Sequence, residues 1–201
     1  MMVIRLANEN DGAAMLDIYG PIIEQTATSF EFSIPSADQF NSRIHKILQT
    51  HPWLVCTDQE SVIGYAYAGP HRSRVAYQWT VEMSVYIDRK FRQRGVARAL
   101  YRALIVCLKQ QGFYTALAGI TLPNESSVEF HQSFGFTPVG TYNNVGYKFG
   151  RWHAVGWWEY VLRSYEESPE APLPLDAVKS SMEVQKIMKS AAASITPNRN
   201  Q

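Results

Sequence analysis

The sequence predicts an α+β protein in which helices pack on a mixed β-sheet, and three observations lead to this fold class. Alternating apolar segments lie on both sides of a long amphipathic helix at residues 94–111. Two of these segments, 53–57 and 62–68, flank a short polar turn, which is typical of a hairpin. Hydrophobic residues make up 46% of the 201 residues and charged residues 18%, so the chain can bury a core. Hairpins combined with strands joined through a helix give a mixed sheet.

The first quarter of the chain predicts one strand followed by two helices. Residues 2–6 form a short apolar strand, and a helical pattern follows over residues 13–19. Pro21 is expected to interrupt that helix or to start the next one. Ser36 and Gln39 form a capping box, and apolar residues recur at helical spacing after it.

A long strand at residues 78–88 follows the hairpin and carries one acidic residue in its middle. Glu82 lies on the face opposite Met83 and Val85, because successive side chains of a strand point to opposite faces. The helix at residues 94–111 comes next and ends at Gly112.

The remaining elements predict that the sheet continues and that a tail follows it. Strands are expected at residues 114–122, 136–142 and 152–162, with a helix at residues 125–134. After Arg163 the composition changes to a proline-rich, acidic segment and then to a weak apolar stripe. These patterns predict a folded domain over residues 1–163. Residues 164–201 are expected to form a linker and a marginal, mobile helical tail.

Composition excludes several classes of protein. Lysine plus arginine number 19 against 18 for aspartate plus glutamate, a formal charge of +1, so no broad basic field for nucleic acid exists. Cys56 and Cys107 are too few for a disulfide scaffold or a four-cysteine zinc site. No apolar leader and no apolar stretch of about 18 residues occurs, so a cytoplasmic protein without a membrane span is expected. Walker, dinucleotide-binding, zincin and serine-hydrolase motifs are also missing.

The basic loop before the long helix carries the strongest chemical pattern. Unpaired N–H groups and the positive end of the helix dipole suit a phosphate or diphosphate. Gly95 lets a ligand approach the backbone, and Arg92, Arg94 and Arg98 add positive charge. A solvated basic loop is the alternative for the arginines alone.

This loop matches the Arg/Gln-x-x-Gly-x-Gly/Ala signature of the GCN5-related N-acetyltransferases, at the strand-to-helix junction where that signature occurs. The matching residues are Arg92-Gln93-Arg94-Gly95-Val96-Ala97, with Ala97 where many members have glycine. Asn124, His131 and Gly135-Phe136 resemble the next motif of the family.

Further segments over residues 2–163 resemble the phosphinothricin and methionine sulfone acetyltransferase branch. They are Pro52-Trp53-Leu54-Val55, Gly64-Tyr65-Ala66-Tyr67-Ala68-Gly69-Pro70, Trp79-Thr80-Val81-Glu82, Leu122-Pro123-Asn124 and Gly146-Tyr147-Lys148-Phe149-Gly150-Arg151-Trp152-His153. The resemblance implies acetyl-CoA held in a splayed gap between two parallel strands, with no metal and no acyl-enzyme. The residues that it implies for acetyl-CoA are Val85, Tyr86, Ile87, Gln93, Arg94, Gly95, Val96, Ala97, Arg98 and Asn124.

Glu82 and His131 are the catalytic candidates. The pKa of an α-amino group is about 7.7–8.0, so a modest base is enough to deprotonate it directly or through water. The matched branch carries glutamate at the position of Glu82 as the proposed base. His131 occupies a motif position where many members have a tyrosine acid, and an acid or base role is as plausible there as packing. For this mechanism the helix start holds the coenzyme A diphosphate, and Glu82 is expected on the same side of the sheet.

The expected acceptor is the α-amino group of a small amino acid or analogue, such as phosphinothricin, methionine sulfone or methionine sulfoximine. An arginine fork fits carboxylate, phosphinate or sulfone oxygens. The candidate substrate residues are Arg72, Arg74, Glu82, Tyr147 and His153. The resemblance also implies a homodimer with neighbouring sites.

Three other functions stay open at this point. The enzyme could instead acetylate a peptide N-terminus, a polyamine or an aminoglycoside. The chain could be an acyl-CoA-sensing module without turnover. A structural protein that binds partners through the tail helix is the third alternative.

Overall fold

The computed structural model describes residues 1–196 and contains a seven-stranded sheet of order β1-β2-β3-β4-β5-β7-β6. Only β4 and β5 run parallel, and the other neighbours are antiparallel. The predicted α+β class with a mixed sheet is thereby confirmed. The strands are β1 (Met2–Leu6), β2 (Trp53–Asp58), β3 (Ser61–Pro70), β4 (Thr80–Ile87), β5 (Thr115–Leu122), β6 (Thr137–Lys148) and β7 (Arg151–Val161).

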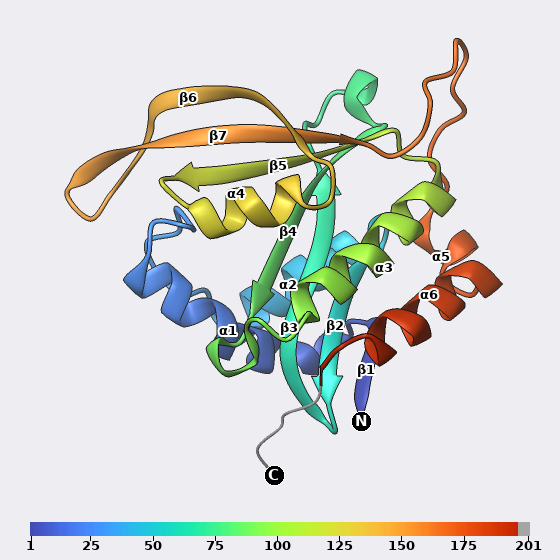
Figure 1. Cartoon of the computed structure of the whole chain (residues 1–201), viewed down its shortest axis with the longest axis horizontal. Coiled ribbons are helices and arrows are strands. Elements are labelled where there is room, and N and C mark those ends of the chain that lie inside the picture. The colour runs from blue at the N-terminus through green and yellow to red at the C-terminus, as the bar shows by residue number, and fades with distance from the viewer. Residues whose placement is uncertain (197–201) are drawn as a thin grey trace.

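Helices cover both faces of the sheet and separate two cores (Figure 1). α3, α4 and α6 pack on one face over aliphatic residues such as Leu54 and Val81. α1 and α2 pack on the other face over the aromatic residues Trp53 and Tyr65. The helices are α1 (Gly12–Gln25), α2 (Ala37–Leu48), α3 (Val96–Gln111), α4 (Glu125–Gln132), α5 (Leu175–Val178) and α6 (Met182–Ala193).

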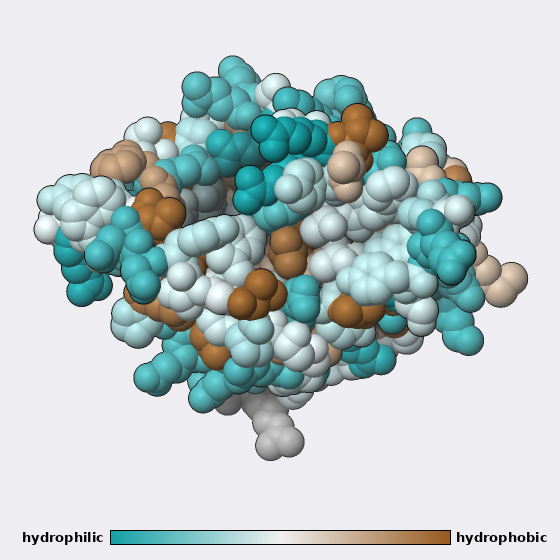
Figure 2. Space-filling view, turned by 90° about the horizontal axis from the view of Figure 1, so that it is seen from above, coloured by the Kyte–Doolittle hydropathy of each residue, from teal (hydrophilic) through white to brown (hydrophobic). Residues whose placement is uncertain are grey.

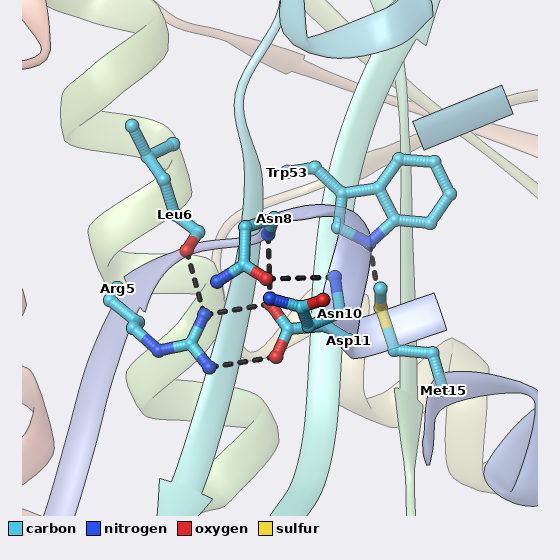
Figure 3. A network of polar contacts seen from close by, with 7 residues as sticks. All are labelled: Arg5, Leu6, Asn8, Asn10, Asp11, Met15 and Trp53. Carbon is cyan, nitrogen blue, oxygen red and sulfur yellow. Dashed lines mark hydrogen bonds and ion pairs between the residues drawn. The ribbon is translucent and has the colours of Figure 1, made fainter. Parts of the chain in front are cut away.

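A polar network fixes the passage from β1 into α1 (Figure 3). The Arg5 guanidinium donates to both carboxylate oxygens of Asp11, at 2.7 Å each. Asp11 also accepts from the backbone N–H of Asn8 at 2.8 Å, and Asp11 is buried. Because an ionised, buried carboxylate needs such partners, these bonds orient the chain as it leaves the sheet.

Two elements run further than the sequence predicts. α1 continues through Pro21, because Ile18, Ile22 and Ile23 are buried on either side of it and their packing outweighs one lost helical hydrogen bond. β6 extends beyond residue 142 to Lys148, pairing with β7 across an irregularity in the register.

α6 is part of the aliphatic core, which differs from the mobile tail that the sequence predicts. Its buried residues follow helical spacing and lie on the side that faces the core. They are Val184, Met188, Ala191 and Ala192, followed by Ile195. Small alanines make this stripe weak in hydropathy but allow close packing on α3 and β1. The last five residues of the expected tail, 197–201, lie outside the described residues.

The β6–β7 ribbon forms one end of the sheet, and β6 is its edge strand. Figure 2 looks onto this side and shows apolar residues scattered among polar ones. Exposed large hydrophobic residues of the ribbon and its turn are Val139, Tyr142, Val145, Tyr147, Phe149, Trp152 and Val161. Within residues 1–196, no helix has the length and apolar character needed to cross a bilayer.

Candidate active site

β4 and β5 separate after three paired residues, which leaves a gap in the sheet. Thr80 pairs with Thr115, Val81 with Ala116 and Glu82 with Leu117. Beyond Glu82 the two strands carry no further register pairs in the described chain, and Figure 1 shows them pointing apart. The β4 edge that faces the gap therefore presents free backbone groups up to Ile87. Val85, Tyr86 and Ile87 lie on this stretch.

The start of α3 lies just beyond the end of β4 and presents backbone amides. Gly95 is the N-cap residue with a φ of +86°, in the left-handed region, and no side chain caps the helix there. A Cβ at Gly95 would meet only the Ser194 carbonyl oxygen, at 3.9 Å, so the conformation rather than crowding calls for glycine. Uncapped amides at a helix start attract an anion. The amides of Val96, Ala97 and Arg98 belong to this first turn.

The arginines around this helix start are mostly engaged by the protein itself. Arg94 donates to the Thr196 carbonyl at 3.2 Å and lies over the Phe91 ring at 4.8 Å. Arg98 donates to the Ser133 hydroxyl at 2.8 Å. The N–H of Thr196 donates in turn to the Arg94 carbonyl, so the segment after α6 supports the loop. The helix start therefore offers an anion its backbone amides, and Arg94 and Arg98 each keep nitrogens that these bonds do not use.

Glu82 lies where the gap begins, but on the face opposite α3. Val81 and Met83 are buried in the core beneath α3, whereas Glu82 shares its face with Tyr86 of the aromatic core. The expectation that the carboxylate and the α3 start share one side of the sheet is therefore wrong. The strands separate directly after Glu82, so its carboxylate lies at the point where the gap begins.

His71 is a site residue that the sequence analysis missed. Its Nδ1 lies 2.7 Å from Glu82 Oε1, and its Nε2 lies 3.2 Å from Arg72 Nε. The ring also contacts Trp157 of β7, with centroids 5.9 Å apart. The hairpin register was the available signal, because a residue just after β3 must lie beside the start of β4.

A hollow of about 400 Å³ brings together two other predicted residues, Asn124 and His153, where β5, α4 and β7 meet. The Asn124 side chain accepts from the Ser127 N–H at 3.2 Å and so caps α4. His153 is buried, and its Nε2 donates to the Lys148 carbonyl at 3.0 Å.

Lys148 fixes one wall of this hollow. Its buried ammonium donates to the carbonyls of Ile23, Thr26 and Ser29 at 2.6, 3.1 and 2.7 Å. Burial lowers the pKa of Lys148, and these carbonyls lie at the C-terminal end of α1, where a cation is favoured. The ribbon and the loop after α1 are thereby tied together.

His131 is a core residue with both ring nitrogens satisfied. Nδ1 donates to the Ser127 carbonyl at 2.7 Å, and Nε2 therefore accepts from the Tyr101 hydroxyl at 2.9 Å. Only 5% of the residue is exposed, and burial lowers its pKa, so the ring is neutral. These contacts favour packing, one of the two roles that the motif left open for this residue.

Arg74 and Tyr147 stand apart from Glu82. Arg74 precedes the 3-10 helix Val75–Tyr77 and lines a separate hollow of about 520 Å³ with Arg72 and Phe113. Tyr147 is half exposed and packs on Trp152 near the end of the ribbon. None of the contacts within residues 1–196 joins either side chain to Glu82. That part of the chain also holds no cluster of three or more histidine, cysteine or carboxylate residues that suits a metal ion.

Comparisons with known proteins agree with this geometry. Residues 4–157 match the family model of the acetyltransferase (GNAT) domain. Phosphinothricin N-acetyltransferase of Streptomyces viridochromogenes is 37% identical over 87% of this chain and 93% of its own length. The L-methionine sulfoximine/L-methionine sulfone acetyltransferase of Salmonella typhimurium is 34% identical over 75% of this chain and 89% of its own. A putative acetyltransferase of Salmonella typhimurium, solved with its cofactor acetyl-CoA, superposes with a TM-score of 0.80 at 32% identity, over 85% of this chain and 99% of its own.

Proposed function

Because the chain belongs to the GNAT acetyltransferase family and is an acetyl-CoA-dependent N-acetyltransferase, we propose that it acetylates the α-amino group of a small amino acid or analogue. Phosphinothricin, methionine sulfone and methionine sulfoximine are the proposed acceptor types, in keeping with the names of its relatives. The observation that carries the proposal is the position of Glu82, a carboxylate at the point where β4 and β5 separate.

Acetyl-CoA fits the gap through backbone groups. The amides at the start of α3, from Gln93 through Arg98, would hold the diphosphate, since that helix start is uncapped. The free β4 edge at Val85, Tyr86 and Ile87 would bind the pantetheine arm. The Asn124 side chain, at the far end of β5, would reach the pantetheine or acetyl region. Bound in this way, acetyl-CoA supplies an activated acetyl group.

Glu82 acts on the acceptor amine. Its carboxylate removes a proton from the ammonium group, directly or through water, which leaves a nitrogen lone pair. That nitrogen forms the new bond to the acetyl carbon and gives up a second proton, the carbon–sulfur bond breaks, and the sulfur leaves with its electron pair and takes up that second proton. His131 is proposed to support the core rather than to supply that proton, because both of its nitrogens are occupied.

Arg72 is the proposed contact for the acceptor's anionic or oxo group. It neighbours His71, which touches Glu82, and only its Nε is occupied there, so its terminal nitrogens remain for a ligand. His153 lines another hollow, and Arg74 lines the same hollow as Arg72 but bonds neither His71 nor Glu82 among the described residues, so both are weaker candidates.

A homodimer is the proposed assembly. The edge strand β6 and its exposed apolar side chains offer a surface that a second copy would cover. The molar mass in solution, from light scattering, tests this. A monomer at all concentrations contradicts it. The cytoplasmic location and the lack of a nucleic-acid partner stay predictions from the sequence.

Release of the coenzyme A thiol tests the function. Purified protein with acetyl-CoA is expected to release thiol when phosphinothricin, methionine sulfone or methionine sulfoximine is added. Glu82→Gln should lower kcat by about 100-fold or more, because a general base supplies acceleration of that order. Acetyl-CoA binding should persist in this variant, and Glu60→Gln, in the exposed β2–β3 turn, is the matched control.

Other outcomes identify the alternatives. Release only with polyamines, aminoglycosides or peptides changes the acceptor class. Acetyl-CoA binding without release across the whole panel identifies a sensor and refutes the enzyme.

A further inference from the structure

We propose that His71 is a positioning residue for Glu82, which holds one carboxylate oxygen so that the other faces the acceptor amine. The inference rests on the proposed role of Glu82 as the base. Its first observation is the short contact between His71 Nδ1 and Glu82 Oε1, at 2.7 Å.

Arg72 decides which nitrogen of His71 carries the proton. The Arg72 Nε–H can only donate, and it points at His71 Nε2 over 3.2 Å. Nε2 is therefore the acceptor nitrogen of a neutral ring, and the proton sits on Nδ1. The Nδ1–H then donates to Glu82 Oε1, so the tautomer that the neighbours require is also the one that binds the carboxylate.

Aromatic side chains from two other parts of the chain hold the imidazole in place. Tyr77 meets the ring edge-on, with centroids 5.8 Å apart, and Trp157 does so from β7 at 5.9 Å. Arg72 also lies over the Tyr77 ring at 5.7 Å. The His71 side chain is 15% exposed as a result, so its hydrogen bond to Glu82 comes from a fixed direction.

Glu82 needs such an anchor because its side chain is 40% exposed and has several rotatable bonds. A base that samples many rotamers spends little time in reach of the amine, and a fixed one avoids that entropic loss. The bond to His71 occupies Oε1 and leaves Oε2 for the incoming proton. His71 does not take the proton onward, because its Nε2 faces the Arg72 donor.

Two substitutions separate the hydrogen bond from the packing. His71→Phe keeps an aromatic ring between Tyr77 and Trp157 but removes the Nδ1–H. His71→Asn gives up the ring but keeps an N–H close to the Nδ1 position. His71→Phe should lower kcat by about 10-fold, as expected for a misplaced catalytic group, with the KM for acetyl-CoA and the Tm unchanged. His71→Asn should recover most of that loss.

The inference is overturned if His71→Phe keeps the wild-type kcat, or if the Phe and Asn variants lose activity equally. The double variant with Glu82→Gln gives a second readout. Because His71 acts through Glu82, His71→Phe should cause little further loss once the carboxylate is gone. If the Glu82→Gln variant keeps full activity, Glu82 is not the base. If Glu82→Gln loses activity but His71→Phe does not change kcat, Glu82 remains the base and only the positioning role of His71 is refuted.

Discussion

His131 and His71 each use both ring nitrogens, yet they face different partners. His131 bonds a carbonyl and a tyrosine hydroxyl inside the aliphatic core, with 5% of the residue exposed. His71 bonds a carboxylate and a guanidinium at the border of the β4–β5 gap. The first arrangement stabilises a core, and we propose that the second orients the base. The partners of the two nitrogens, more than the place of a histidine in a motif, decide its role.

The largest expected effect comes from His131→Ala. It removes a ring that packs on Phe136 and leaves the Tyr101 hydroxyl and the Ser127 carbonyl without this partner. The free energy of unfolding should fall by about 3 kcal/mol, which urea denaturation measures. Assayed well below its Tm, the variant should keep its kcat. A kcat loss of tenfold in folded protein would restore the catalytic role that the motif suggests and remove the contrast with His71.

Mild acid tests whether the buried histidines are neutral. His51 resembles His131 in being buried, and burial lowers its pKa to about 4 from an ordinary 6.5. Below pH 6.5 the unfolded chain therefore binds more protons than the folded one, so stability must fall as the pH falls towards 4. Between pH 7 and 5 the loss from His51 should be about 2 kcal/mol.

The matched variant for this test is His51→Phe. It keeps a ring against Phe113, on which His51 stacks with centroids 5.2 Å apart, and removes the titrating group. Stability of this variant should fall less between pH 7 and 5 than that of the unaltered protein. An equal fall in both proteins contradicts the assignment of the acid response to His51.

Tyr101→Phe is the smallest and most specific change. It keeps the buried ring, which meets Phe130 and Phe134, and removes only the hydroxyl that bonds His131 Nε2. The expected cost is about 1 kcal/mol of stability, the net value of one hydrogen bond, with kcat unchanged. A variant as stable as the wild type but slower would show that the Tyr101–His131 pair serves the reaction instead of the core.

Local patterns predicted most of the fold. The Ser36 and Gln39 capping box is present at α2, and the hairpin of β2 and β3 forms as expected. Predictions failed where distant packing decides the outcome. Pro21 stays helical because of the sheet beneath it, and α6 is held by α3 and β1. The packing partner of each helix lies far away along the chain, so the neighbouring sequence does not identify it.

The predictions for the site also succeeded where local patterns decide and failed where distant packing does. The separation of β4 from β5 agrees with the gap that the family resemblance implies, and the basic loop before α3 was recognised from residues that adjoin one another along the chain. The face of Glu82 relative to α3 depended on which side the helix crosses, and that prediction failed. Trp157, which is far along the chain, holds the His71 ring, whereas the place of His71 beside the start of β4 follows from the hairpin register, a signal that was not used.

The two hydrogen bonds between Thr196 and Arg94 bear on where this chain can be truncated. The match to the family model ends at residue 157. A chain cut there would lose Ile195, Met188 and the other buried residues of α6 and the segment after it, together with the hydrogen bonds to the loop before α3. A fragment that keeps these bonds therefore has to reach residue 196, well past the end of the family match.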